Sequence, residues 1–269
     1  MSAVEMSPFA ISNVTQTNPA AGEYFVLGTR VDAVQIPGVI TQMQDWIALR
    51  DACRYIAVTG MHGVTEAKHD PQLRAALASA NLVVPDGMPL VWLGRRRGFT
   101  LPRRVYGPEL MLRFWQETQS ARYRHFFYGG APGVADALAH KFARQFPNHQ
   151  IAGTFSPPYR NVNSEEDQAI CSLINHSKPD IVWVGLGTPK QERWMRDHQD
   201  RLSAPVLVGV GAAFDFHAGR MRSAPVWMGD HGLEWLFRLA QEPRRLWRRY
   251  LLRGAEFAAL AILELVKPK

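Results

Sequence analysis

The chain has 269 residues, 46% of them hydrophobic, which is enough to bury the core of one large or two small α/β domains. Its 31 basic and 24 acidic residues leave a formal net charge of +7, so an anionic partner is expected, whether nucleic acid, phospholipid or a phosphorylated substrate. The two cysteines show neither the CxxC spacing of a metal or redox site nor the density of a disulfide scaffold, which indicates a reducing cytosol.

The N-terminal segment, residues 1–22, contains Ser, Asn, Thr and Pro but no basic start followed by a long apolar run. It does not resemble a signal peptide, and we expect a flexible tail. No window reaches the roughly 20 apolar residues that span a bilayer. The nearest, Ala255–Val266, is too short and contains two glutamates, so we do not expect an integral membrane protein.

Short β-rich runs alternate with amphipathic stretches along the rest of the chain. Strands are expected at Tyr55–Thr59, Leu82–Val84, His125–Tyr128, Ile181–Gly185 and Val206–Val210. Helical patterns fill the gaps, for example at Pro132–Phe146, Glu165–Ile174 and Pro189–His198. This alternation predicts a Rossmann-like, mainly parallel α/β sheet flanked by helices. A break near Ala224-Pro225 predicts an α/β catalytic domain over residues 23–225 and a C-terminal helical appendage over residues 226–269.

Ligands of open α/β sheets bind at the carboxyl ends of the strands. The strand His125–Tyr128 runs into Gly129 and Gly130 before a helix, which places free backbone N–H groups where a diphosphate could bind. A tight turn that needs positive φ explains the same glycines equally well. No GxGxxG motif with an acidic residue about 20 positions further on follows any strand. This weakens the hypothesis that the chain is a nicotinamide-dependent oxidoreductase.

The strand Ile181–Gly185 ends in a turn through Gly187 that is followed by three polar side chains. Lys190 can neutralise phosphate, Gln191 can read a base or a sugar amide, and Glu192 can accept hydrogen bonds from hydroxyls. A solvated first helical turn would explain any one of them. Three functional side chains directly after Gly-x-Gly favour a binding site.

Two carboxylates follow other strand ends. Asp86 lies in a Pro-Asp-Gly turn after Leu82–Val84, where it could act as a general base on a hydroxyl. On its own this pattern favours ordinary turn chemistry, because Asp often forms local hydrogen bonds at such positions. Asp215 is flanked by apolar residues, and its burial would need a partner such as Arg220 or Arg222.

A basic amphipathic helix is predicted to begin at Glu242-Pro243. Its arginines are Arg244, Arg245, Arg248, Arg249 and Arg253. Its large apolar residues are Leu246, Trp247, Tyr250 and Leu251. At about 100° per residue the two groups occupy opposite halves of the helix. This favours an interfacial helix on anionic lipid, where each basic residue contributes about 1 kcal/mol, over a core-packed helix with a solvated basic face. The arginines could also contact diphosphates.

Together these motifs resemble the WecG/TagA/CpsF glycosyltransferases, glycosyltransferase family 26, from about Arg54 to Tyr250. The matching segments are Pro85-Asp86-Gly87, Arg104–Gly107, Tyr128–Gly130, Phe155–Tyr159, Gly185–Glu192, Phe214–Gly219 and Arg222–Pro225. The resemblance implies an inverting transfer of N-acetylmannosamine, a uronic acid or a similar hexose from a UDP-sugar. The implied acceptor is an undecaprenyl-diphosphate-linked saccharide in bacterial exopolysaccharide or cell-envelope synthesis.

The resemblance also implies roles for individual residues. Asp86 matches the catalytic base, Arg104 and Gln191 match residues that bind the diphosphate or the sugar, and Asp215 matches a second site carboxylate. The family's Thr-x-Asn segment appears here as Val58-Thr59-Gly60-Met61-His62, which leaves Thr59 or His62 as the substrate contact. The remaining substrate-binding candidates are Gly129, Gly130, Tyr159, Gly187, Lys190 and Glu192.

The sequence contains no DxD triplet of the kind that holds Mg²⁺ or Mn²⁺ in metal-dependent transferases, so we expect no metal cofactor and assign the leaving diphosphate to arginines and helix N-termini. The expected partners are the UDP-sugar, the lipid-linked acceptor, an anionic membrane surface and, from the resemblance, a second copy of the chain, but no nucleic acid.

We expect a cytoplasmic protein on the inner face of the cell membrane. An inert UDP-sugar-binding scaffold at the membrane is the alternative.

Overall fold

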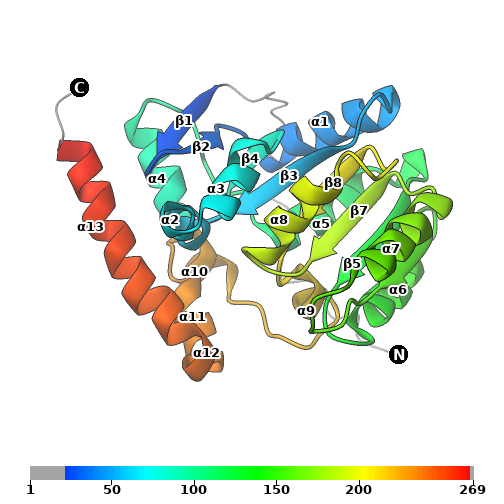
Figure 1. The fold of residues 1–269 in the computed structure, drawn as a ribbon. Helices are drawn as coiled ribbons and strands as arrows, with labels where there is room; N and C mark the ends of the chain where they lie inside the picture. Colours follow the sequence, from blue (N-terminus) through cyan, green and yellow to red (C-terminus); the bar gives the residue numbers. More distant parts are fainter. Residues whose placement is uncertain (1–21, 267–269) are drawn as a thin grey trace, which may run out of the picture.

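The computed structural model describes residues 22–266, apart from the side chains of Val226, Arg245 and Arg249, so most of the expected N-terminal tail lies outside the described residues. Its centre is a six-stranded, fully parallel sheet in the order β4-β3-β8-β7-β5-β6 (Figure 1). The strands are β3 (Arg54–Thr59), β4 (Leu82–Pro85), β5 (Arg124–Gly129), β6 (Gln150–Phe155), β7 (Ile181–Gly185) and β8 (Val206–Gly209). The expected α/β architecture is therefore confirmed, as are all five predicted strands.

The edge strand β6 was not predicted from the sequence. It pairs only with β5, and its residues are at most half-buried, so it lacks the continuous apolar run that marks the inner strands. Gly153 lies in its middle, where a Cβ atom would come within 2.7 Å of the Phe126 ring. Close packing against the neighbouring strand therefore explains a glycine that weakened the strand pattern.

Helices cover both faces of the sheet and enclose two apolar cores. One face carries α1 (Ile36–Leu49), α5 (Gly107–Glu117), α6 (Val134–Gln145) and the short α9 (Ala213–His217). The other carries α3 (Pro71–Ala78), α7 (Ser164–His176) and α8 (Lys190–His198). The connection between α5 and β5 contains a 3₁₀ turn, Gln119–Ala121. The buried strands are apolar on both sides because both sides are covered.

A third apolar cluster joins the N-terminal hairpin to the last helix of the described residues. It contains residues of the antiparallel hairpin β1 (Glu23–Val26) and β2 (Thr29–Asp32), of α2 (Met61–His69) and α4 (Met88–Arg96), and of the last helix, α13 (Arg253–Val266). Phe257 and Ala261 of α13 are buried there. The Glu264 carboxylate accepts a hydrogen bond of 2.8 Å from the Leu27 backbone N–H and pairs with Arg97. The C-terminal helix is thus docked on the α/β body.

The other C-terminal helices, α10 (Val226–Asp230), α11 (Glu234–Gln241) and α12 (Pro243–Trp247), run along one side of the body (Figure 1). Between α12 and α13 lies a π-helical turn, Arg248–Leu252. A π turn shifts the helical register, so the expected continuous 100° wheel does not hold across it. Within residues 22–266, no helix combines the length and apolar character that crossing a bilayer requires.

Candidate active site

A cleft of about 560 Å³ lies at the carboxyl ends of four adjacent strands, β4, β3, β8 and β7. The loops that follow these strands form its floor, and α11 together with Tyr250 of the π turn forms the opposite wall. Six of the residues predicted from the sequence line it: His62, Asp86, Arg104, Gly187, Gln191 and Asp215. The sheet topology therefore gathers candidates that lie far apart in sequence, as expected for an open parallel sheet.

The predicted base, Asp86, lies directly after β4. Its backbone N–H donates a hydrogen bond of 2.8 Å to the Thr59 carbonyl, and its carbonyl lies where a Cβ atom on Gly60 would approach to 2.3 Å. At this position only glycine allows the loops after β3 and β4 to come this close. Gly87 follows with a φ of +123°. The backbone thus holds Asp86 tightly at the cleft.

Arg104 lies between two carboxylates in the cleft. Its Nη1 is 3.8 Å from Oδ1 of Asp86, and its Nη2 pairs with Glu234 of α11. The guanidinium also stacks over the Tyr106 ring at 4.1 Å. Burial opposes the charge, but the carboxylates of Glu234 and Asp86 outweigh it and raise the pKa of Arg104. Arg104 therefore stays cationic and joins the sheet to the C-terminal segment.

Gln191 connects two of the loops that form the cleft. Its Oε1 accepts hydrogen bonds from the backbone N–H groups of Gly187 at 3.2 Å and Gly211 at 3.0 Å. Its Nε2 donates to Glu192 at 3.0 Å, and the Thr188 hydroxyl donates to the same carboxylate at 2.8 Å. The Gln191 amide therefore fixes the turn after β7 against the turn after β8. Glu192 is fully buried beneath this turn and lies outside the cleft lining.

Asp215 lies on α9 and faces the cleft. Within residues 22–266 its carboxylate forms no ion pair with Arg220 or Arg222, the partners expected from the sequence. Instead, its backbone carbonyl accepts hydrogen bonds from Arg220 N–H at 2.9 Å and Met221 N–H at 3.2 Å, which end the short helix. Partial exposure to the cleft removes the need for a buried counter-ion.

Other predicted substrate contacts lie outside the cleft. Gly129 and Gly130 pack against the end of β7: a Cβ atom on Gly129 would lie 2.6 Å from the Gly185 backbone, and Gly130 N–H donates to the Gly185 carbonyl at 2.9 Å. The structure thus accounts for these glycines by strand packing. Lys190 is solvent-exposed, and Tyr159 is 81% exposed on the loop after β6.

Thr59 is also excluded from the cleft. Its side chain is 1% exposed and lies beneath α2, where a Cβ atom on Gly63 would come within 2.2 Å of its Oγ1. Among residues 22–266 this hydroxyl has no hydrogen-bond partner. His62, the other candidate for this substrate contact, does line the cleft.

The sequence reasoning missed the side chains that α11 contributes. Glu234, Trp235 and Arg238 line the cleft, and the Trp235 ring lies 6.2 Å from that of Tyr250. The Arg238 guanidinium lies 5.6 Å from the Phe216 ring, and its Nε has no hydrogen-bond partner among the described residues. Burial opposes its charge, yet the Tyr250 hydroxyl and Glu234 raise the pKa of Arg238. The i, i+4 spacing of Glu234 and Arg238 is the one sequence signal that could have placed both on one helix face.

The predicted membrane-facing residues have different surroundings. Arg244, Trp247 and Arg248 are exposed, and the Arg248 guanidinium lies 5.3 Å from the Trp247 ring. Arg253 instead pairs with Glu66 at 3.4 Å and Glu256 at 2.7 Å, which holds α13 against α2. The side chains of Arg245 and Arg249 lie outside the described residues.

An open parallel sheet whose strand ends gather polar side chains around one cleft is typical of an α/β enzyme that binds its ligand at this edge. The sequence profile of the glycosyl transferase WecG/TagA/CpsF family matches residues 24–269. The chain belongs to this family and is a glycosyltransferase.

The chain is also similar to individual proteins of named activity. Over 186 residues the chain is 33% identical to an N-acetylglucosaminyldiphosphoundecaprenol N-acetyl-beta-D-mannosaminyltransferase of Bacillus spizizenii, an alignment that covers 69% of the chain and 70% of the relative. Proteins of the same name from Bacillus subtilis and Staphylococcus aureus strain MW2 are 30% and 28% identical, over 65% and 63% of the chain and 66% and 65% of the relatives. The chain thus matches about two thirds of the length of these relatives.

Proposed function

We propose that the chain transfers N-acetylmannosamine, or a closely related hexose, from a UDP-sugar to an undecaprenyl-diphosphate-linked saccharide, with inversion at the anomeric carbon. The observation that carries this proposal is the pairing of Asp86 with Arg104 in a cleft that also holds the half-buried Arg238. The names of the relatives support the acceptor and the sugar, because they are N-acetyl-mannosaminyltransferases to N-acetylglucosaminyldiphosphoundecaprenol.

In the proposed reaction the acceptor hydroxyl oxygen bonds to the anomeric carbon while the bond from that carbon to the UDP oxygen breaks. Asp86 accepts the hydroxyl proton, and UDP leaves from the opposite side with the bonding electron pair. Asp86 suits this role because the backbone around Gly60 and Gly87 fixes its position at the strand end.

Arg238 is the proposed principal contact of the leaving diphosphate. Arg104 already faces two carboxylates, Asp86 and Glu234, which partly neutralise it. Arg238 forms no ion pair with the described residues, and its half-buried side chain lines the cleft wall with its Nε shielded from solvent. A guanidinium with spare donors binds a diphosphate through charge-assisted hydrogen bonds. Because arginines supply this stabilisation, we propose that the transfer needs no added Mg²⁺ or Mn²⁺.

The exposed surface around α12 is the proposed membrane contact. It presents the cations Arg244 and Arg248 beside the apolar side chains of Trp247, Leu251 and Leu252, which are 41%, 50% and 56% exposed. Aromatic and aliphatic groups next to arginines suit the boundary between anionic headgroups and acyl chains. This surface lies in the same segment as Tyr250 and α11, so the proposed docking places the cleft beside the lipid that carries the acceptor.

The test is UDP release from a panel of UDP-sugars, with and without a short-chain lipid-diphosphate-N-acetylglucosamine acceptor. Release that requires the acceptor, and that is largest with UDP-N-acetylmannosamine, is expected with no added Mg²⁺. UDP-sugar binding without release, in the presence of acceptor, lipid vesicles and Mg²⁺, would contradict the transferase proposal and favour the inert scaffold.

A further inference from the structure

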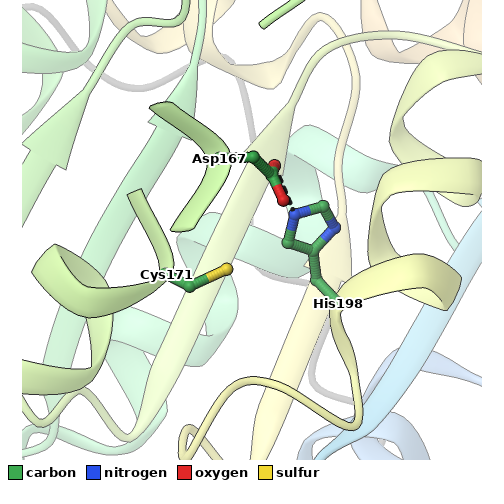
Figure 2. Close-up of side chains that lie close together, drawn as sticks. All are labelled: Asp167, Cys171 and His198. Carbon is green, nitrogen blue, oxygen red and sulfur yellow. Dashed lines mark hydrogen bonds and ion pairs between the residues drawn. The ribbon is translucent and has the colours of Figure 1, made fainter. Parts of the chain in front are cut away.

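A second group of polar side chains lies away from the cleft, between α7 and α8. Asp167 and Cys171 are one helical turn apart on α7, and His198 is the last residue of α8. Figure 2 shows the Asp167 carboxylate, the Cys171 sulfur and the His198 ring gathered around one point. One ligand atom from each residue lies within 4.8 Å of the others. No CxxC-type motif marks this group in the sequence, because the three residues come from two helices.

The hydrogen bonds of His198 restrict what this group can do. Its Nδ1 lies 2.7 Å from the Trp194 carbonyl, and its Nε2 lies 2.9 Å from Oδ1 of Asp167. Both ring nitrogens are therefore engaged, so no nitrogen is left to take a proton from the Cys171 thiol. A Cys-His-Asp nucleophile of the protease type is excluded, because there the histidine must bridge the thiol and the carboxylate.

Zinc–nitrogen and zinc–oxygen bonds of about 2 Å need a slightly wider gap than the 2.9 Å between Nε2 and Oδ1, so a small shift of the Asp167 carboxylate would let the same residues hold a metal ion. A carbonyl can accept a hydrogen bond only from a protonated Nδ1, so in the neutral ring the Nε2 lone pair faces the Asp167 carboxylate. Two electron-rich groups at 2.9 Å need a proton or a cation between them. Metal-bound histidines commonly donate their other ring N–H to a backbone carbonyl, as His198 does to Trp194.

We propose that Asp167, Cys171 and His198 bind one Zn²⁺ ion. A thiolate, an imidazole and a carboxylate form a ligand set that zinc favours, and the two anionic ligands balance its charge. Cys171 loses its proton to solvent on binding. Arg201 hydrogen-bonds the second Asp167 oxygen at 2.5 Å and so orients the carboxylate from behind. The Asp167 side chain is 19% exposed, which leaves access for a water molecule as the fourth ligand.

The proposed role of the zinc is structural. It would join the N-terminal half of α7 and the last residue of α8, two helices that cover the same face of the sheet. His198 lies seven residues beyond Gln191 on α8, which is about 10 Å along the helix axis. The site is therefore separate from the sugar-transfer cleft, and it does not depend on the proposed reaction.

The chain offers a matched control, because it has only two cysteines. The test is titration of the chelator-treated full chain with Zn²⁺ against a competing dye, and with Co²⁺ as a spectroscopic probe. We expect one ion per chain and a thiolate-to-cobalt absorption band. Cys171→Ser should abolish the band and weaken Zn²⁺ binding by at least about 100-fold, since even second-shell changes commonly cost 10–100-fold. Cys53→Ser should keep both the band and the affinity.

Circular dichroism identifies variants that fail to fold, and thermal unfolding gives a second measurement: Zn²⁺ should raise the Tm of the wild type and Cys53→Ser but not that of Cys171→Ser. A folded wild type that binds no Zn²⁺ would overturn the proposal and leave a protonated His198 paired with Asp167. Equal Zn²⁺ affinity in the wild type and Cys171→Ser would overturn it as well.

Discussion

The two walls of the cleft are built in different ways. The floor consists of strand-end loops that are fixed by backbone hydrogen bonds and by close approaches at Gly60 and Gln191. The opposite wall consists of side chains from α11, joined to the floor through the Arg104–Glu234 ion pair. The floor thus positions the group proposed to react, whereas the C-terminal wall supplies the charge proposed to bind the diphosphate. Changes in the floor should affect turnover, and changes in the wall should affect binding and docking.

The largest effect is expected from Asp86→Asn. The amide keeps the size of the side chain but cannot accept the acceptor's proton, so kcat should fall by about 10³-fold, with KM for the UDP-sugar changed little. Acceptor-dependent UDP release measures both constants. A variant that turns over at the wild-type rate would remove Asp86 from the mechanism.

A pH effect on stability is expected from the floor. Burial lowers the pKa of His217, on α9, to about 4, and its Nε2–H donates to the Pro108 carbonyl at 2.8 Å. As the pH falls below about 6.5, His217 binds a proton in the unfolded chain before it does so in the folded chain. The free energy of unfolding therefore decreases with falling pH, down to about pH 4, where His217 of the folded chain is protonated as well. The loss should approach about 3 kcal/mol. Urea unfolding from pH 7.5 to pH 4 measures it, and His217→Gln should show a shallower decline than the wild type.

The contact between floor and wall is tested by Glu234→Gln. Loss of this buried carboxylate should reduce the free energy of unfolding by about 2 kcal/mol, less than for most broken buried pairs because Arg104 keeps Asp86 nearby. Urea unfolding measures the change. The exposed pair Arg103–Asp230, 3.2 Å apart, is the control, and Asp230→Asn should cost no more than about 1 kcal/mol. Equal effects of the two substitutions would contradict a special role for the buried pair.

The smallest effect concerns the membrane. Arg244→Gln should weaken binding to vesicles that contain anionic lipid by about fivefold, which corresponds to about 1 kcal/mol for one surface cation. Co-sedimentation at fixed ionic strength measures the binding. Arg144→Gln removes an equally exposed arginine from α6 and should bind as the wild type does. An equal loss in both variants would indicate attraction by net charge alone.

The sequence predicted the inner sheet and much of the floor for a physical reason. Strands buried on both faces are continuous apolar runs, and in a parallel sheet the residues after them meet at one edge. Asp86 and Gln191 could therefore be placed in one site. The same reasoning could not separate Gly129, required for packing against Gly185, from a glycine that faces a ligand. The contribution of Arg238 was not visible because it depends on how a distant helix docks.

We propose that the C-terminal wall completes the donor site. Calorimetric titration of UDP into the wild type, Arg238→Gln and the control Arg144→Gln, without added metal, tests it most directly. One UDP should bind per wild-type chain, and Arg238→Gln should weaken binding by about 10-fold or more, as expected when a charged hydrogen-bond donor to phosphate is lost. If Arg238→Gln binds UDP as tightly as Arg144→Gln does, the C-terminal wall takes no part in donor binding, contrary to the proposal.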